Sequence, residues 1–356
     1  MLNYSIKQRF TPAFSPGKGL YVFRLGYNTG WTLLNQLLCA ARQSYSEGDI
    51  TRLLNLKMAA ALFLILTVLP AQGVDNPSKW NEQNQAWRNK HAQSLSAADG
   101  WLSVVALDWL TTGENSFGTN AEDKIKLHIP GHDHFGVVDV EPNAVRLKAP
   151  RGGFPSTFKV DGHVAREQEL VVDGTSPTTM TSGTLTFFII RRGDRFALRV
   201  KDSHAPARRE FHGLRWYRPN LQYVIEAEWI PYPEPKQIGI QNVVGIPTKG
   251  LTPGVAKLRI KGQDVVLEPF VQSVSAKELL FVIRDSTSVK ATYPASRFLH
   301  TGLPDHGLSE RGKIVLDFNR LENPPCAFTP LATCPLPPPN NRIRVALAVG
   351  ELRYSH

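Results

Sequence analysis

Apolar and polar residues alternate with a period of two along most of the chain after about residue 98, as in strands that bury one face. The alternating runs are short and are separated by turns rich in Gly, Pro and Asp, such as Asp161-Gly162 and Gly262-Gln263. Many short strands joined in this way form sandwiches or barrels. The pattern therefore predicts a mainly β protein, with its clearest C-terminal strands at 223–230, 278–285, 313–319 and 342–349.

One helix is expected ahead of the strands, within 74–97. Asn76 can cap it and Pro77 suits its first turn. Trp80, Trp87 and His91 recur near one face, which is typical of an amphipathic helix.

The strands fall into two groups, with a soft boundary near 201–210. The first group, 98–205, is expected to form a β-sandwich. The second, 206–356, is expected to form a further sandwich or a barrel-like unit. It contains a proline-rich loop, 323–342, in which seven of twenty residues are proline.

Residues 58–73 have the pattern of a signal peptide, because an apolar run follows basic residues and ends before small ones. The run is shorter than the ~20 residues that a helix needs to cross a bilayer. We therefore expect export to a secreted or periplasmic location, with no stable transmembrane span and a mature chain that begins near Val74. Residues 1–57 are expected to be an untranslated or disordered extension. A buried helix of an N-terminal extension is the alternative.

The net charge of +10 is not spread evenly along the chain. Residues 1–73 carry seven Lys/Arg and two Asp/Glu, which leaves 34 basic against 29 acidic residues in the rest. The remaining basic residues are scattered and form no stripe interleaved with aromatic residues. The sequence therefore argues against nucleic acid as a partner.

The proline-rich loop holds Cys326 and Cys334, two of the three cysteines. Cys39 would be removed with the leader, so in an oxidising compartment these two would be the remaining pair. We expect a disulfide that closes the loop. A zinc half-site would need further thiol or imidazole ligands, and none accompanies the pair at a suitable spacing.

Polar residues of the second unit suggest a site. In the strand expected at 313–319, alternation places Asp317 on the polar face, and Glu351 ends the apolar stripe of the last strand, where a carboxylate needs a partner. One interpretation is a pocket in which Arg284 or Arg297 holds an anionic ligand while Asp317 or Glu351 acts as acid or base. The alternative is a set of buried ion pairs and Asx turns that fasten the loop to the sheet. The other candidate ligand-binding residues are Asp285, Tyr293, Asn319, Asn323 and Arg342.

The stretch around Gly113, WLTTGENSFGTNAEDKIKL, resembles the first turn of a forkhead-associated (FHA-like) β-sandwich. The resemblance implies such a sandwich over 98–205. Phosphothreonine-binding members carry an arginine directly after the glycine, whereas Glu114 stands here. The bidentate phosphate contact is therefore missing, and the resemblance does not imply phosphopeptide binding.

Five motifs together resemble the domain-of-unknown-function 1684 family, across nearly the whole expected mature chain. The TYPASRFL motif departs from the family pattern in having Ser296 where a glycine usually precedes the arginine, which bears only on the backbone conformation of one turn. The resemblance implies no substrate and no catalytic residue. The motifs are GWLSVVALDWLTTGENSFG (100–118), RRGDRFALRVKD (191–202), FHGLRWY (211–217), TYPASRFL (292–299) and the segment from LDFNR to PPPNNR (316–342).

No nucleotide-binding loop or metal-ligand spacing appears, and the three histidines in 128–136 stand in a Pro-Gly turn context, so no cofactor and no metal are expected. The function we predict is that of an exported cell-envelope protein with a binding or structural role. Its ligand would be an unknown anionic small molecule, a glycan or another envelope component, bound in the second unit. The alternative is a cofactor-free hydrolase that uses Asp317 and Glu351 with Arg297. Protein interaction through an exposed sheet edge is a third hypothesis.

Overall fold

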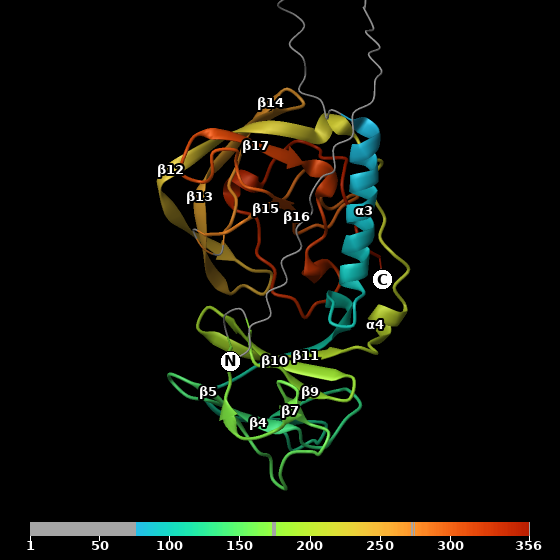
Figure 1. Cartoon of the computed structure of the whole chain (residues 1–356), viewed down its shortest axis with the longest axis vertical. Helices are drawn as coiled ribbons and strands as arrows, with labels where there is room; N and C mark the ends of the chain where they lie inside the picture. Colours follow the sequence, from blue (N-terminus) through green and yellow to red (C-terminus); the bar gives the residue numbers. More distant parts are fainter. Residues whose placement is uncertain (1–75, 173–175, 272, 274, 356) are drawn as a thin grey trace, which may run out of the picture. The chain divides into compact units, whose positions relative to one another are not determined.

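The computed structural model of this chain describes residues 76–172, 176–271, 273 and 275–355 (Figure 1). The expected leader, 58–73, and the extension before it lie outside the described residues, and both remain predictions. From Val74 onward the chain forms one compact body. Within it, the names first unit and second unit refer below to the strand groups before and after residue 205. No helix in the described ranges has both the length and the apolar content that a membrane crossing requires.

The expected N-terminal helix is α3, Pro77–Leu95. The Asn76 side chain accepts a hydrogen bond from the backbone N–H of Lys79 (3.0 Å), and Pro77 occupies the first turn, as the sequence predicts. The buried face is not a simple apolar stripe, because Asn84 and Arg88 are buried on it together with Trp80 and Leu95. Arg88 donates to the Tyr217 carbonyl (3.3 Å), whereas the buried Asn84 amide has no hydrogen-bond partner among the described residues. In Figure 1, α3 lies beside the C-terminal strands.

Residues from about 98 to 205 form two sheets with a shared apolar core. Aromatic side chains meet in this core, with the Phe135 and Phe187 rings 4.8 Å apart between centroids and Phe117 close to both. All pairings are antiparallel except that of β2 with β3. The six-stranded sheet has the order β1 (Val104–Trp109), β11 (Arg195–Asp202), β10 (Leu185–Arg192), β9 (Met180–Ser182), β6 (Lys159–Val160) and β7 (His163–Val164). The five-stranded sheet has the order β3 (Ile125–Lys126), β2 (Gly113–Gly118), β4 (Gly136–Val140), β5 (Val145–Lys148) and β8 (Gln168–Glu169).

The second unit is also built on strands, and they do not close into a barrel. Its core contains Trp229 and the apolar side chains of a four-stranded and a two-stranded sheet. The short helix α4 (Pro206–Arg209) precedes these sheets. Single 3₁₀ turns lie at 101–103, 221–223, 318–320, 325–327 and 339–341. The four-stranded sheet has the order β14 (Gln263–Leu267), β13 (Pro247–Ile260), β12 (Val224–Gln241) and β17 (Gly312–Asp317), and the two-stranded sheet pairs β15 (Leu279–Ile283) with β16 (Arg297–Thr301).

The last expected strand, 342–349, is not a strand. The alternation still predicts correctly which side chains are buried, because Val345, Leu347 and Val349 all lie in the C-terminal core. The segment packs on the core without a continuous neighbouring strand. Its backbone groups therefore need other partners.

The predicted disulfide is wrong, because Cys326 and Cys334 are free thiols. The backbone N–H of Cys326 donates to the Cys334 sulfur (3.2 Å), and hydrogen bonding between the thiols lowers the pKa of Cys326 and raises that of Cys334. Cys334 packs in an apolar cluster with Phe270 and Phe298. Its carbonyl accepts a hydrogen bond from the backbone N–H of Val243 (2.9 Å). Packing and backbone hydrogen bonds hold the loop without a covalent link.

Candidate functional site

The candidate residues from the sequence fall into four places in the second unit. Arg297 and Asp285 meet inside the core. A second group lies near α3 and the turns next to it: Asp317, Asn319, Asn323 and Glu351. A separate surface pocket is lined by Arg284 and Arg342. Tyr293 lies beside the proline-rich loop, where its hydroxyl donates to the Cys326 carbonyl (2.8 Å).

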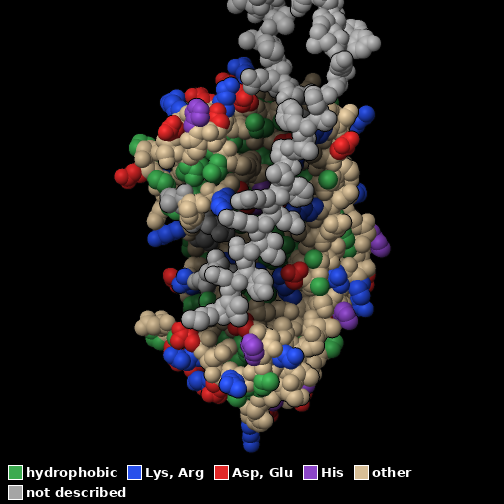
Figure 2. Space-filling view, viewed as in Figure 1, with side chains coloured by type: hydrophobic (Ala, Val, Ile, Leu, Met, Phe, Trp, Pro, Cys, Tyr) green, Lys and Arg blue, Asp and Glu red, His purple; other side chains and the backbone are tan. Residues whose placement is uncertain are grey.

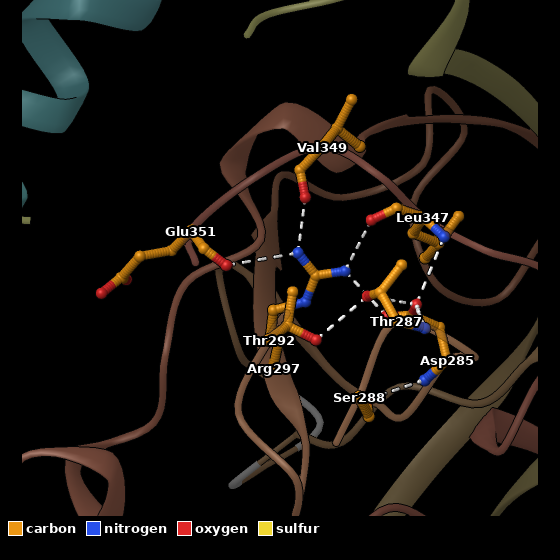
Figure 3. Close-up of polar contacts among 8 residues, drawn as sticks. All are labelled: Asp285, Thr287, Ser288, Thr292, Arg297, Leu347, Val349 and Glu351. Carbon is orange, nitrogen blue, oxygen red and sulfur yellow. Dashed lines mark hydrogen bonds and ion pairs between the residues drawn. The ribbon is translucent and has the colours of Figure 1, made fainter. Parts of the chain in front are cut away.

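Arg297 and Asp285 form a fully buried ion pair (Figure 3). Arg297 begins β16 and Asp285 follows β15, so pairing of these two strands brings the residues together. The Nη2 atom of Arg297 lies 2.7 Å from Oδ2 of Asp285, and both side chains are at most 1% exposed. Burying two charges is costly unless they are paired and further hydrogen-bonded.

The remaining groups of the pair are satisfied mostly by backbone. Arg297 donates to the carbonyl groups of Val349 (2.5 Å) and Leu347 (2.9 Å), and it approaches that of Glu351 (3.5 Å). In Figure 3 the carbonyl of Glu351 faces the guanidinium while its carboxylate points away. The guanidinium thus supplies the partner that the segment after Val345 lacks, and its side chain is fully buried.

Both oxygens of Asp285 accept hydrogen bonds, whereas Nε of Arg297 has no hydrogen-bond partner among the described residues. Oδ1 of Asp285 accepts hydrogen bonds from the backbone N–H (2.7 Å) and hydroxyl (2.6 Å) of Thr287 and from the backbone N–H of Leu347 (3.2 Å). This arrangement is the buried ion pair with an Asx turn that the sequence offered as an alternative to a ligand site.

Glu351 is also buried, and it faces Asn323 and α3. Its two carboxylate oxygens accept from the backbone N–H (2.8 Å) and the side-chain amide (2.7 Å) of Asn323. Its Oε2 also lies 3.3 Å from Nε2 of His91. Asn319 is likewise used structurally, since its amide group bonds to the Asn220 backbone and to Asp317.

His91 on α3 is clamped between two carboxylates. Its Nδ1 lies 3.2 Å from Glu322, on the opposite side of the ring from Glu351, and the ring stacks on Trp87 at 5.7 Å. Burial lowers the pKa of His91, but hydrogen bonding to Glu351 and the charges of Glu322 and Glu351 outweigh it, so the pKa is raised. Burial raises the pKa of Glu322.

A groove of about 600 Å³ lies next to this clamp and is lined by side chains of α3, β12, β16 and β17. Asp317 lies in its wall, where Oδ2 accepts from the indole Nε1 of Trp80 (3.1 Å) and lies 3.6 Å from Nε of Arg320. His300 joins the groove to the clamp, because its Nε2 lies 3.8 Å from Glu322. The main lining residues are Trp80, Trp87, Lys277, Glu278, His300, Asp317 and Arg320.

The sequence reasoning missed most of this groove. It placed Trp80, Trp87 and His91 on one helix face but had no signal that the face meets Glu322 and His300, which belong to strands and turns far along the chain. Asp317 is the predicted site residue that does line the groove. On the face seen in Figure 2, basic and acidic side chains are interspersed.

These features define a mainly β protein with a helix-walled polar groove in its second unit. Residues 209–352 match the family described as "Protein of unknown function (DUF1684)". The family resemblance is thus confirmed for the second unit, and for the residues before 209 it stays a prediction. No curated protein matches the sequence significantly. A solution NMR structure of an uncharacterized protein from Haloarcula marismortui is 28% identical over 41% of this chain and 80% of that chain, with a TM-score of 0.36.

We expect Asp285→Ala to lower the free energy of unfolding by about 3–5 kcal/mol, because it leaves the Arg297 guanidinium buried without its counter-charge. Urea denaturation of the purified protein measures the loss. The matched control is Asp264→Ala, which breaks the exposed pair with Arg259 and should cost less than about 1 kcal/mol. Equal, small losses in both variants would contradict a structural role for the buried pair.

We expect His91 to titrate above its ordinary value of 6.5. Because the pKa is higher in the folded state, the stabilisation is complete below about pH 6.5 and is lost as the pH rises through the folded-state pKa. The melting-temperature difference between wild type and His91→Gln should therefore shrink from pH 6 to pH 9. His163→Gln, at an exposed histidine in β7, is the control. A difference that grows with pH would show that the carboxylates do not hold the proton.

Proposed function

We propose that the protein is an exported binding protein of the cell envelope and that its groove beside α3 takes a hydroxyl-rich ligand such as a glycan. The single observation that carries the proposal is the composition of the groove. An aromatic side chain, Trp87, lies beside polar groups of both signs, and the volume of about 600 Å³ falls within the range of ~300–1,000 Å³ typical of ligand pockets.

Both signs of charge favour a neutral polar ligand over an ion. Lys277 and Arg320 would attract an anion, but Glu278 and Asp317 in the same wall oppose it. A hydroxyl group both donates and accepts hydrogen bonds, so a row of hydroxyls can satisfy carboxylate, imidazole and ammonium groups together. Indole rings add apolar contact area with a polar edge.

The alternative of a hydrolase gains less support from the same geometry. Of its three residues, Asp317 lines the groove, whereas Glu351 is bonded to Asn323 and Arg297 is buried with Asp285. A group must reach a reacting atom to act in catalysis.

Export and the FHA-like character of 98–205 belong to the proposal. The pattern of 58–73 supports export, and a sandwich of two packed sheets is compatible with an FHA-like unit. A secreted or periplasmic location would bring the groove into contact with envelope glycans. The free thiols of the loop lend no support to an oxidising compartment.

We expect Trp87→Ala to abolish or weaken at least about tenfold the binding of any oligosaccharide that shifts the melting temperature of the wild type. Screening a panel of neutral and charged oligosaccharides by thermal shift, followed by calorimetry, tests this. Trp109→Ala is the matched control, because Trp109 is also half-buried beneath an arginine but lies in β1 of the first unit. Silence across the panel, or equal losses in both variants, would contradict a glycan groove.

We expect intact-mass spectrometry of native protein from its source cells to give an N-terminus near Val74, because cleavage after 58–73 would remove everything before it. Cell fractionation should recover this shorter form outside the cytosol. Full-length protein in the cytosol would contradict export and would leave the groove proposal to be tested by itself.

A further inference from the structure

A second surface pocket of the C-terminal unit, separate from the groove in its lining residues, carries three arginines. Arg284, Arg342 and Arg344 line it together with Ser286 and Ser288, and its volume is about 350 Å³. All three arginines are exposed.

Backbone pairing holds these side chains on neighbouring chain segments. Arg284 and Arg342 form a parallel bridge, in which the N–H of Arg284 donates to the Asn341 carbonyl (3.0 Å) and the N–H of Ile343 donates to the Arg284 carbonyl (2.9 Å). Arg344 follows two residues after Arg342, so the pocket is built on a fixed backbone. A fixed backbone reduces the entropy lost on binding.

The three guanidinium groups have no counter-charge among the described residues. The Nε of Arg284 donates to the Pro294 carbonyl (3.0 Å) and that of Arg342 to the Pro337 carbonyl (3.2 Å), so backbone oxygens orient both side chains without neutralising them. Neither these two nor Arg344 forms an ion pair with a described carboxylate. Other exposed arginines do, as Arg311 does with Glu228 at 3.1 Å.

The one carboxylate that borders the pocket is already neutralised. Asp285 lies in the pocket lining, yet its side chain points inward to Arg297 at 2.7 Å and accepts from Thr287 and the Leu347 backbone. The charge of Asp285 is therefore neutralised by Arg297 and not by the arginines of the pocket. The pocket keeps an excess of three positive charges close together, which costs repulsion unless an anion binds.

We propose that this pocket binds a phosphate group. A phosphate presents several strong acceptor oxygens and up to two negative charges, so it can accept from more than one guanidinium at once, whereas a single carboxylate has two oxygens and one charge. Guanidinium forks match phosphate geometry. The exposed Ser286 hydroxyl, on the segment between Arg284 and Ser288, adds a neutral donor. The proposal is independent of the groove and of its ligand.

The phosphate could belong to a soluble molecule or to a lipid headgroup, and two experimental arms separate these sources. Calorimetry with inorganic phosphate and pyrophosphate at low ionic strength measures binding from solution. Flotation with phosphatidylcholine vesicles, with and without phosphatidic acid, measures binding to a membrane surface. We expect saturable binding in at least one arm, and weaker binding as salt is added.

Arg344→Ala should weaken binding in that arm at least about tenfold, because it removes an exposed arginine that forms no hydrogen bond or ion pair with the described residues and so leaves the fold intact. The matched control is Arg218→Ala, which removes an exposed arginine outside the pocket lining and should leave binding within about twofold of wild type. Absence of binding in both arms, or equal weakening by the two substitutions, would overturn the proposal.

Discussion

The second unit depends on one buried ion pair. Arg297 and Asp285 carry opposite charges into a dry core, where each is tolerable only because of the other. The guanidinium also donates hydrogen bonds to the backbone carbonyls of Leu347 and Val349. It thus takes the place of the neighbouring strand that segment 342–349 does not have. That segment continues to Glu351, whose carboxylate reaches Asn323 and His91. The pair thus fixes the chain that anchors α3 and one side of the groove.

Period-two alternation predicted correctly which side chains are buried, but it did not predict which segments pair as strands. It placed Asp317 on the polar face of its strand, and in β17 Asp317 lines the groove while its neighbour Leu316 is buried. The same pattern at 342–349 predicted a strand, and the residues are buried as expected without forming one. Alternation reports which side chains leave water, whereas the partner of each backbone group depends on residues distant in sequence. Here the partner is an arginine side chain.

For the cysteines and His91, too, the sequence could not predict which groups each side chain contacts. Two cysteines in a rigid loop suggested a covalent closure, yet burial of Cys334 among apolar side chains and backbone bonds at both ends hold the loop without it. His91 was readable as part of a helix face. Its two carboxylate partners come from the other end of the chain, and no local spacing signals that Glu322 and Glu351 flank one imidazole.

The buried pair also decides how charge is distributed at the surface. Asp285 is the acidic residue best placed to neutralise Arg284, its neighbour in the chain, but Arg297 draws the carboxylate inward. Arg284, Arg342 and Arg344 are therefore left without a counter-charge among the described residues, while acidic and basic side chains share the wall of the groove beside α3. A site of one sign selects an anion, and a site of both signs selects a neutral polar molecule. Because Asp285 is paired with Arg297 inside the core, the pocket around Arg284 keeps charge of one sign.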